Sequence, residues 1–304
     1  MHGVDMREVW LKGSYSEMGR QFGETLSEWH RTFVPSKELL SFARECEKSA
    51  KQYASDILDE LRGIAKSTGA SYESLISTSL APTFAFGCTL LAVDGRHTSH
   101  GSPLFARQQD WIKSDIDSLH VIHAEPADRY RTVGFSFGDC GRYGGQNEKG
   151  LTIGSAYVGM YTGKIRPGIR MSISSRWALD NFASTEETVE YLMRIPHTEP
   201  VAFLIADQQG AIARVETCPE KTSVSYADDG TCVVSNCFVH EDMRHLDKGW
   251  PEGNIVYRLI DATSKWIEEK SSGISFDGIK SLCSDNQNGI CVFSEDSEDA
   301  TRWS

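Results

Sequence analysis

The spacing of apolar residues changes near residue 88. Before that point apolar side chains recur every three or four positions, which is the period of a helix that buries one face. Met18, Phe22 and Leu26 show this spacing. Ser14 and Glu17 stand just before them in a capping-box pattern, which marks the start of a helix. We therefore expect a helix that begins after Ser14.

Three further helices are expected before residue 80. One spans residues 37–54 after a Pro-Ser break, and the next carries an apolar face over 57–65 until Gly69 ends it. Ser71 then caps a short third helix. Residues 1–80 are thus predicted to be mostly helical.

After residue 88 the pattern is typical of short strands. Segments that are apolar or alternating, bounded by Gly, Pro or Asp, occur at 89–93, 103–106, 119–124, 131–137, 151–156, 201–206, 212–215 and 232–235. The sixth and seventh segments are expected to form a hairpin, and Gly144-Gly145 a loop. Ser184 and Glu187 mark a helix start, and a last helix carries Arg258. The order of elements indicates mixed α and β structure.

Composition excludes some functions. The chain has 304 residues with 24% charged and 39% hydrophobic residues, as an ordinary soluble globule has. Its formal net charge of -12 argues against a nucleic-acid partner, because phosphate binding relies on clustered Lys and Arg. No apolar run approaches the ~20 residues that span a bilayer, and residues 1–5 lack the pattern of a signal peptide. We expect no membrane association and a cytoplasmic location.

Eight cysteines occupy positions 46, 88, 140, 218, 232, 237, 283 and 291. No two have Cys-x-x-Cys spacing, and His120 and His123 lack an evident third ligand, so we expect neither a metal nor another cofactor. Seven of the cysteines are interpreted as small buried hydrophobes.

Cys88 is the exception, because of its neighbours. It begins a predicted strand between Gly87 and Thr89, and Arg107 and Asp110 follow the next predicted strand. A cysteine so placed is a candidate nucleophile. If the Gly87-Cys88 bond were cut, the new α-amine, with an unperturbed pKa of about 8, could act as the base for its own thiol. The competing interpretation is a buried strand cysteine.

Six stretches of the sequence, in this order, carry a family resemblance: Trp10 to Gly19, Glu60 to Ala65, Gly87 to Thr89, Arg107 to Trp111, Asn147 to Leu151 and Ser235-Asn236. Together they resemble the N-terminal-nucleophile amide hydrolases of the isopenicillin N acyltransferase and peptidase C45 branch. Choloylglycine hydrolases and penicillin V acylases are more distant relatives. The fourth stretch departs from the family by having Gln108 where the family has Asn.

The resemblance implies an α+β fold, the four-layer αββα sandwich, with a helical N-terminal segment. It implies one domain over 1–304 that cuts itself before Cys88 into a segment of 1–87 and a segment of 88–304. The two segments would remain together as an α/β heterodimer, and a homo-oligomer is left open.

The resemblance also assigns roles to residues around the nucleophile Cys88. Arg107 and Asp110 would hold the thiolate and the α-ammonium group, although an ordinary surface ion pair is the competing interpretation. Asn236 would donate to the oxyanion, or else form a turn. For the second donor we choose the backbone N–H of Tyr157.

Arg258 is placed near the active site by the same resemblance, with a solvated helix arginine as the competing interpretation. The function expected is that of a self-processing cysteine hydrolase, which cleaves a linear, non-peptide N-acyl amide through a Cys88 thioester. Two other functions stay open: an acyl-CoA-dependent N-acyltransferase at the same site, and a catalytically inactive binding module on this scaffold.

Overall fold

The computed structural model describes residues 6–26, 32–82, 87–109, 111–112, 118–249, 255–270, 272–285 and 302–303. The helices are α1 (Tyr15–Gly23), α3 (Lys37–Tyr53), α4 (Ser55–Thr68), α5 (Tyr72–Ser79), α6 (Met171–Asn181), α7 (Thr185–Arg194), α8 (Ile255–Lys270) and α9 (Phe276–Cys283), with a 3-10 turn at Arg244–Leu246. The strands are β1 (Arg7–Gly13), β2 (Cys88–Val93), β3 (Leu104–Gln109), β4 (Trp111–Ile112), β5 (His120–Pro126), β6 (Thr132–Ser136), β7 (Gly144–Asn147), β8 (Thr152–Tyr157), β9 (Val201–Ala206), β10 (Ile212–Thr217), β11 (Thr222–Tyr226), β12 (Thr231–Ser235) and β13 (Arg302–Trp303).

Two sheets form the centre of the molecule. The large sheet has the order β1-β5-β6-β7-β8-β9-β10-β11, and the small sheet has the order β12-β2-β3. Strand β1 pairs with β5 in parallel, whereas β2 pairs with both of its neighbours antiparallel. A short antiparallel pair joins β4 to β13.

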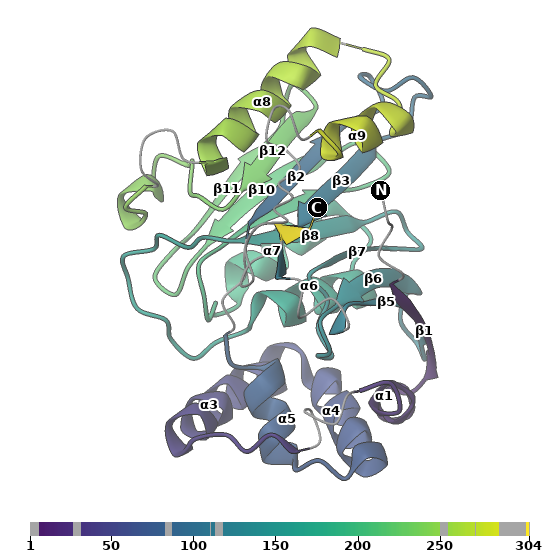
Figure 1. The fold of residues 1–304 in the computed structure, drawn as a ribbon, viewed down its shortest axis with the longest axis vertical. Helices are drawn as coiled ribbons and strands as arrows, with labels where there is room; N and C mark the ends of the chain where they lie inside the picture. Colours follow the sequence, from purple (N-terminus) through teal and green to yellow (C-terminus); the bar gives the residue numbers. More distant parts are fainter. Residues whose placement is uncertain are drawn as a thin grey trace.

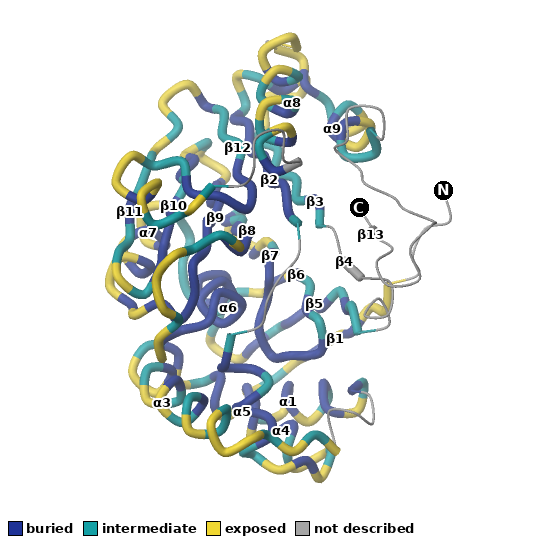
Figure 2. Tube along the Cα trace, turned by 60° about the vertical axis from the view of Figure 1, so that its left-hand side comes forward, coloured by how far each residue is buried: buried dark blue, intermediate teal, exposed yellow. Residues whose placement is uncertain are grey.

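The sheets and helices stack in four layers (Figures 1 and 2). The small sheet packs on β8, β9 and β10 of the large sheet. Helices α6 and α7 cover the other face of the large sheet, and α8 and α9 pack on the outer side of the small sheet. Apolar side chains such as Leu90 and Leu204 fill the space between the sheets. The predicted αββα sandwich is confirmed.

The helical N-terminal segment gathers at one end of the molecule (Figure 1). Helices α1 and α4 cross so closely that a Cβ atom at Gly19 would lie 2.0 Å from the carbonyl oxygen of Glu60. A Cβ atom at Gly63 would lie 2.2 Å from the carbonyl oxygen of Ser16. Only glycine fits at such distances. The first two stretches of the family resemblance therefore meet at this crossing.

The helix boundaries agree with the capping signals in the sequence. Ser14 and Glu17 form the capping box of α1, and Ser36 and Ser71 accept N-terminal backbone hydrogen bonds of α3 and α5. Gly69 ends α4 with a left-handed φ of 73°. These predictions are confirmed because each depends on residues adjacent in sequence.

Several elements were predicted wrongly or missed. Strand β11 and helix α9 have no counterpart among the predicted segments. Residues 7–13 form strand β1 within the segment expected to be mostly helical. Gly144-Gly145 begins strand β7 rather than a loop. A Cβ atom at Gly145 would lie 2.4 Å from the carbonyl oxygen of Val133, so this strand depends on having no side chain there. Helix α6 was not predicted, because its buried face carries polar residues such as Ser172 and Arg176 in place of an apolar stripe.

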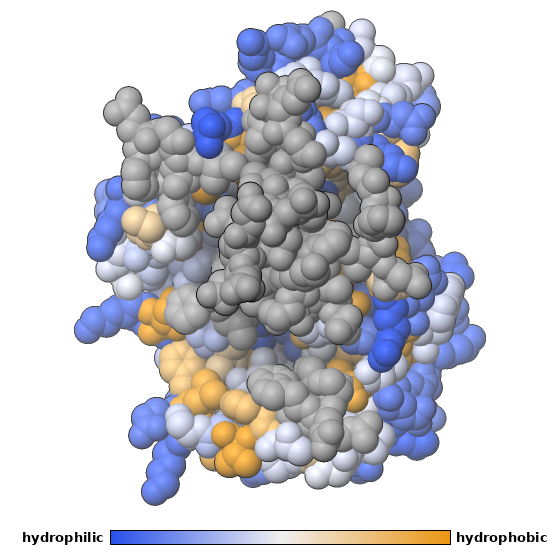
Figure 3. Space-filling model, viewed as in Figure 1, coloured by the Kyte–Doolittle hydropathy of each residue, from blue (hydrophilic) through white to orange (hydrophobic). Residues whose placement is uncertain are grey.

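Figure 3 shows one face of the molecule in the view of Figure 1. The described residues on this face are largely hydrophilic, and hydrophobic patches lie toward the end that holds α1, α3, α4 and α5. Within the part of the chain that the structure describes, no helix has the length and apolar character needed to cross a bilayer.

Candidate active site

Cys88 lies at the first position of β2, between the two sheets. Side chains of a strand alternate between its faces. Cys88, Leu90 and Ala92 therefore pack toward the large sheet, whereas Leu91 and Val93 pack with residues of α8 and α9. Only 2% of Cys88 is exposed. The thiol is thus held in the interior, at the end of a strand.

Arg107 contacts the Cys88 thiol from the neighbouring strand β3. Its Nη2 lies 3.2 Å from the Cys88 Sγ, and its Nε and Nη2 donate to the carbonyl oxygen of Ser155 at 3.2 and 3.0 Å. Nη1 donates to the side-chain oxygen of Gln109. Burial lowers the pKa of the Arg107 guanidinium, while the neighbouring Cys88 raises it. Because an arginine stays charged in proteins, this arrangement favours the thiolate form of Cys88.

A glycine in the large sheet makes this contact sterically feasible. A Cβ atom at Gly154 would lie 2.5 Å from the Leu90 side chain and 3.3 Å from the Cδ of Arg107. Because Gly154 has no Cβ atom, the two sheets approach closely enough for Arg107 to reach Ser155. The ring of Phe135 supports the guanidinium, with 4.7 Å between Cζ and the ring centroid.

Asn236 holds the backbone of Cys88 from the end of β12. Its Oδ1 accepts from the Cys88 N–H at 2.6 Å, and its Nδ2 donates to the carbonyl oxygen of Tyr157 at 2.7 Å. An N–H only donates and a carbonyl only accepts, so these two partners fix which way the amide points. Ser235 adds a hydrogen bond from its Oγ to the Cys88 carbonyl at 2.9 Å. The nitrogen of the Gly87-Cys88 bond is therefore fixed in place.

The structure brings together Cys88, Arg107, Asn236 and Tyr157 from different strands. Tyr157 contributes its carbonyl to Asn236, so its N–H as an oxyanion donor stays a prediction. Asp110 lies outside the described residues.

Arg258 is exposed on α8, a helix that packs on β12 and β2. Its side chain therefore faces solvent in this structure, as the competing interpretation of a solvated helix arginine has it.

Ser155 and Phe135 contact Arg107 but were not singled out in the sequence. Both belong to the large sheet and reach Arg107 from across the sandwich. No local pattern connects them to Cys88. Ser235 was part of a stretch that resembles the family, and its position next to Asn236 was the available signal.

The two histidines of β5 make contacts unrelated to metal binding. Trp10 stacks on His123 with ring centroids 3.9 Å apart, and the Nδ1 of His120 lies 2.7 Å from the Ser118 carbonyl oxygen. Burial lowers the pKa of His120. The described residues hold no group of three or more His, Cys, Asp or Glu side chains arranged for a metal ion.

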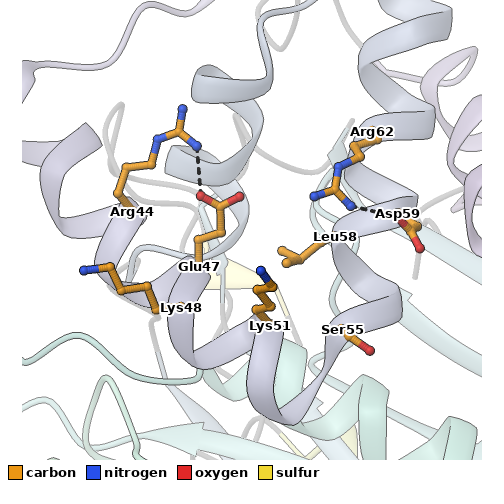
Figure 4. A pocket seen from close by; sticks show the side chains of 8 residues that line it. All are labelled: Arg44, Glu47, Lys48, Lys51, Ser55, Leu58, Asp59 and Arg62. Atoms are coloured by element: carbon orange, nitrogen blue, oxygen red, sulfur yellow. Dashed lines mark hydrogen bonds and ion pairs between the residues drawn. The ribbon is translucent and has the colours of Figure 1, made fainter.

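A surface groove of about 490 Å³ lies between α3 and α4, toward the opposite end of the molecule from β2 (Figures 1 and 4). Its lining residues are Arg44, Glu47, Lys48, Lys51, Ser55, Leu58, Asp59 and Arg62. Several of its cations are paired within the helical segment: Arg44 with Glu47 at 2.8 Å and Arg62 with Asp59 at 2.7 Å. The groove is thus a salt-bridged surface that is separate from the Cys88 site.

Comparison with known families decides which family the chain belongs to. Residues 97–268, more than half of the chain, match the family described as acyl-coenzyme A:6-aminopenicillanic acid acyl-transferase. The chain belongs to this family. The match includes Arg107 and Asn236 and begins after Cys88. No curated protein matches the chain.

Solved structures of low sequence identity resemble the chain. A Caenorhabditis elegans ortholog of N-acylethanolamine-hydrolyzing acid amidase is 14% identical with a TM-score of 0.50, over 67% of this chain and 89% of its own. A conjugated bile acid hydrolase mutant from Clostridium perfringens is 18% identical with a TM-score of 0.45, over 71% and 83%. Penicillin V acylase from Agrobacterium tumefaciens is 19% identical with a TM-score of 0.39, over 73% and 72%. The nematode likeness shows the fold of this acyl-transferase family member, and the resemblance to N-terminal-nucleophile hydrolases is confirmed.

Proposed function

We propose that this protein is a self-processing cysteine amidase that cleaves linear, non-peptide N-acyl amides. The observation that carries the proposal is the placement of Cys88. Its thiol lies 3.2 Å from the Arg107 guanidinium, and its backbone N–H lies 2.6 Å from the Asn236 oxygen. Thiol and nitrogen, the two groups that an N-terminal nucleophile uses, are each held by one polar side chain.

Self-cleavage creates the mature nucleophile. The Cys88 sulfur attacks the Gly87 carbonyl carbon, the C–N bond breaks, and the nitrogen takes a proton to become the α-amine of Cys88. Water then hydrolyses the thioester, which leaves a carboxylate on Gly87 and restores the thiol. The Asn236 oxygen already accepts a hydrogen bond from this nitrogen. It therefore keeps the new amine next to the Cys88 sulfur, for which the amine acts as the base.

Turnover repeats the same chemistry on a substrate amide. The α-amine takes the thiol proton, the thiolate attacks the acyl carbon, and the protonated amine donates to the leaving nitrogen. Water then releases the acyl group from Cys88 as a carboxylate. Arg107 stabilises the thiolate, and Asn236 is the donor proposed for the oxyanion. Asp110, adjoining β3 in sequence, is proposed to orient the α-ammonium group.

The test of the proposal is the state of the purified wild-type chain. It should migrate as two bands under denaturing conditions, and Edman sequencing of the larger should begin Cys-Thr-Leu-Leu. A panel of penicillin V, conjugated bile acids and N-acylethanolamines, the substrate classes in the names of structural neighbours, should contain an amide that the cut protein hydrolyses. A single uncut chain that is inert toward the whole panel would favour a binding module.

Acyl transfer is the second candidate, because the matched family is named for it. The acyl-Cys88 thioester would then be resolved by an amine acceptor in place of water. Supplying a phenylacetyl or fatty acyl thioester of coenzyme A with 6-aminopenicillanic acid distinguishes the two outcomes. Formation of an N-acyl product faster than free carboxylic acid identifies a transferase.

After self-cleavage, segments 1–87 and 88–304 are proposed to stay together as a heterodimer. Arg176 of α6 binds Glu60 of α4 at 3.1 Å, and both side chains are fully buried. The Tyr15 hydroxyl adds a 2.6 Å hydrogen bond to Asp180. These contacts connect the two segments without a covalent bond. A cytoplasmic location also stays a prediction, which cell fractionation checks.

Arg107→Lys should lower turnover by about 100-fold, the order of effect seen when a charge-stabilising donor is lost. Lysine keeps the charge but cannot reach Cys88, Ser155 and Gln109 together. Steady-state kinetics on the best amide measures the effect, with Arg131→Lys on the exposed surface as the control. Turnover near the wild-type rate at an unchanged melting temperature would show that Arg107 does not support the nucleophile.

Asn236→Ala should lower kcat by roughly 100- to 1000-fold with a smaller change in KM, as expected for a group that acts in the transition state. Asn236→Asp should lower kcat further, because a carboxylate would face both the Tyr157 carbonyl and the developing oxyanion. Single-turnover acylation rates measure the effect. An unchanged acylation rate in Asn236→Ala would limit the residue to a structural turn.

A further inference from the structure

Arg170 binds the carboxyl end of helix α5, which is the helix that precedes the Gly87-Cys88 bond in the chain. Its Nη1 donates to the carbonyl oxygen of Thr78 at 2.8 Å and to that of Ser79 at 3.3 Å. The last carbonyls of a helix lack partners within the helix, and a cation is favourable there. Arg170 is 2% exposed, so the contact is made in the interior of the protein.

Other buried groups hold Arg170 in turn. Its Nη1 lies 3.1 Å from the Asp139 carboxylate, and its Nη2 donates to the hydroxyl of Tyr143. The Tyr143 carbonyl accepts from the N–H of Ser155 at 3.2 Å and from the Ser155 hydroxyl at 3.0 Å. The Ser155 carbonyl is the group that anchors Arg107. A continuous set of polar contacts therefore connects the end of α5 to the arginine that contacts the nucleophile.

The contact between Arg170 and α5 lies close in the sequence to the scissile bond. Helix α5 ends at Ser79, and Cys88 follows it by only nine residues. Arg170 fixes the chain before the scissile bond, and Asn236 fixes the nitrogen of the bond itself. Holding reacting groups in position lowers the barrier, and a misplacement of about 1 Å can cost on the order of 100-fold in rate.

A second buried arginine provides a matched comparison. Arg176 lies six residues further along the chain, in α6, and is as fully buried as Arg170. It also binds the N-terminal segment, but it does so through a salt bridge to Glu60 in the middle of α4 rather than through the end of α5. Loss of either contact weakens the packing of the same segment, whereas only Arg170 holds the stretch that leads to Cys88.

We propose that Arg170, held by Asp139 and Tyr143, is a positioning residue for self-cleavage at Gly87-Cys88. By fixing the carboxyl end of α5 it directs the scissile carbonyl toward the thiol. This inference rests on the proposed self-processing function.

The test is a pulse-chase of full-length chains made by cell-free synthesis, in which cleavage is followed with time on denaturing gels. Arg170→Lys should cut about 10- to 100-fold more slowly than wild type. Once cut, it should turn over amides near the wild-type rate per mole of cut chain, because Arg107 and Asn236 are intact. Arg176→Lys should lose a comparable amount of melting temperature but cut near the wild-type rate.

Each result decides the inference. Equal slowing in Arg170→Lys and Arg176→Lys, or normal cutting of Arg170→Lys, overturns it while wild-type cleavage keeps the proposed function. A wild-type chain that never cuts overturns both. If Arg170→Lys does not fold, Tyr143→Phe replaces it, because this change removes only the hydroxyl that contacts Arg170. Slower cutting of Tyr143→Phe then supports the inference, and an unchanged rate overturns it.

Discussion

Replacing Cys88 with alanine should leave a single uncut chain that turns over no amide. The substitution removes the thiol that attacks Gly87, so the α-amine that would serve as the base is never released. Loss of a catalytic nucleophile typically costs on the order of a million-fold in turnover. Gel electrophoresis, intact mass and amidase assays of the purified variant measure both effects.

Cys232→Ala is the matched control for this prediction. Cys232 lies on β12, paired with Ala92 of β2 in the same small sheet as Cys88. Its replacement should leave cutting and turnover intact. Cys88→Ser should cut slowly, because a hydroxyl is a weaker nucleophile than a thiolate. Amide turnover by an uncut Cys88→Ala chain would disprove the N-terminal-nucleophile mechanism.

Replacing Arg176 with methionine should cause the largest loss of stability. Its guanidinium lies 2.6 Å from Asp180 and 3.1 Å from Glu60, and all three side chains are fully buried. Without it, the buried Glu60 and Asp180 carboxylates lose the cation that pairs with both of them. Burial alone already raises the pKa of Glu60, which shows how poorly this site solvates a charge. Breaking a buried pair in this way costs about 3–5 kcal/mol.

The free energy of unfolding is best measured in a Cys88→Ala background, where the chain is expected to stay in one piece. Arg62→Met in the same background is the control, because Arg62 pairs with Asp59 on the exposed side of α4. An exposed ion pair contributes little, so this variant should unfold close to the parent. If Arg176→Met and Arg62→Met unfold at similar urea concentrations, the buried network does not hold the two segments together.

The sequence by itself determined the features that depend on near neighbours. Capping residues fixed where α3, α4 and α5 begin or end, and Gly69 marked a left-handed turn that other residues adopt at a cost. The apolar run after Cys88 indicated strand β2, and the order of the resembling stretches indicated the family. These signals lie within a few residues of the structure that they predict.

Only the tertiary structure decided the contacts that make the site. Asn236 lies 148 residues from Cys88 in the sequence. It accepts a hydrogen bond from the Cys88 N–H because β12 pairs with β2. Arg107 reaches Ser155 because Gly154 lets the sheets approach. Strand β7 and helix α6 were missed for the same reason: glycines and buried serines gain their stability from packing partners distant in the sequence. Local propensity and periodicity depend only on neighbouring residues and therefore carry no information about such distant partners. The geometry around Cys88 is instead determined by the packing of the two sheets.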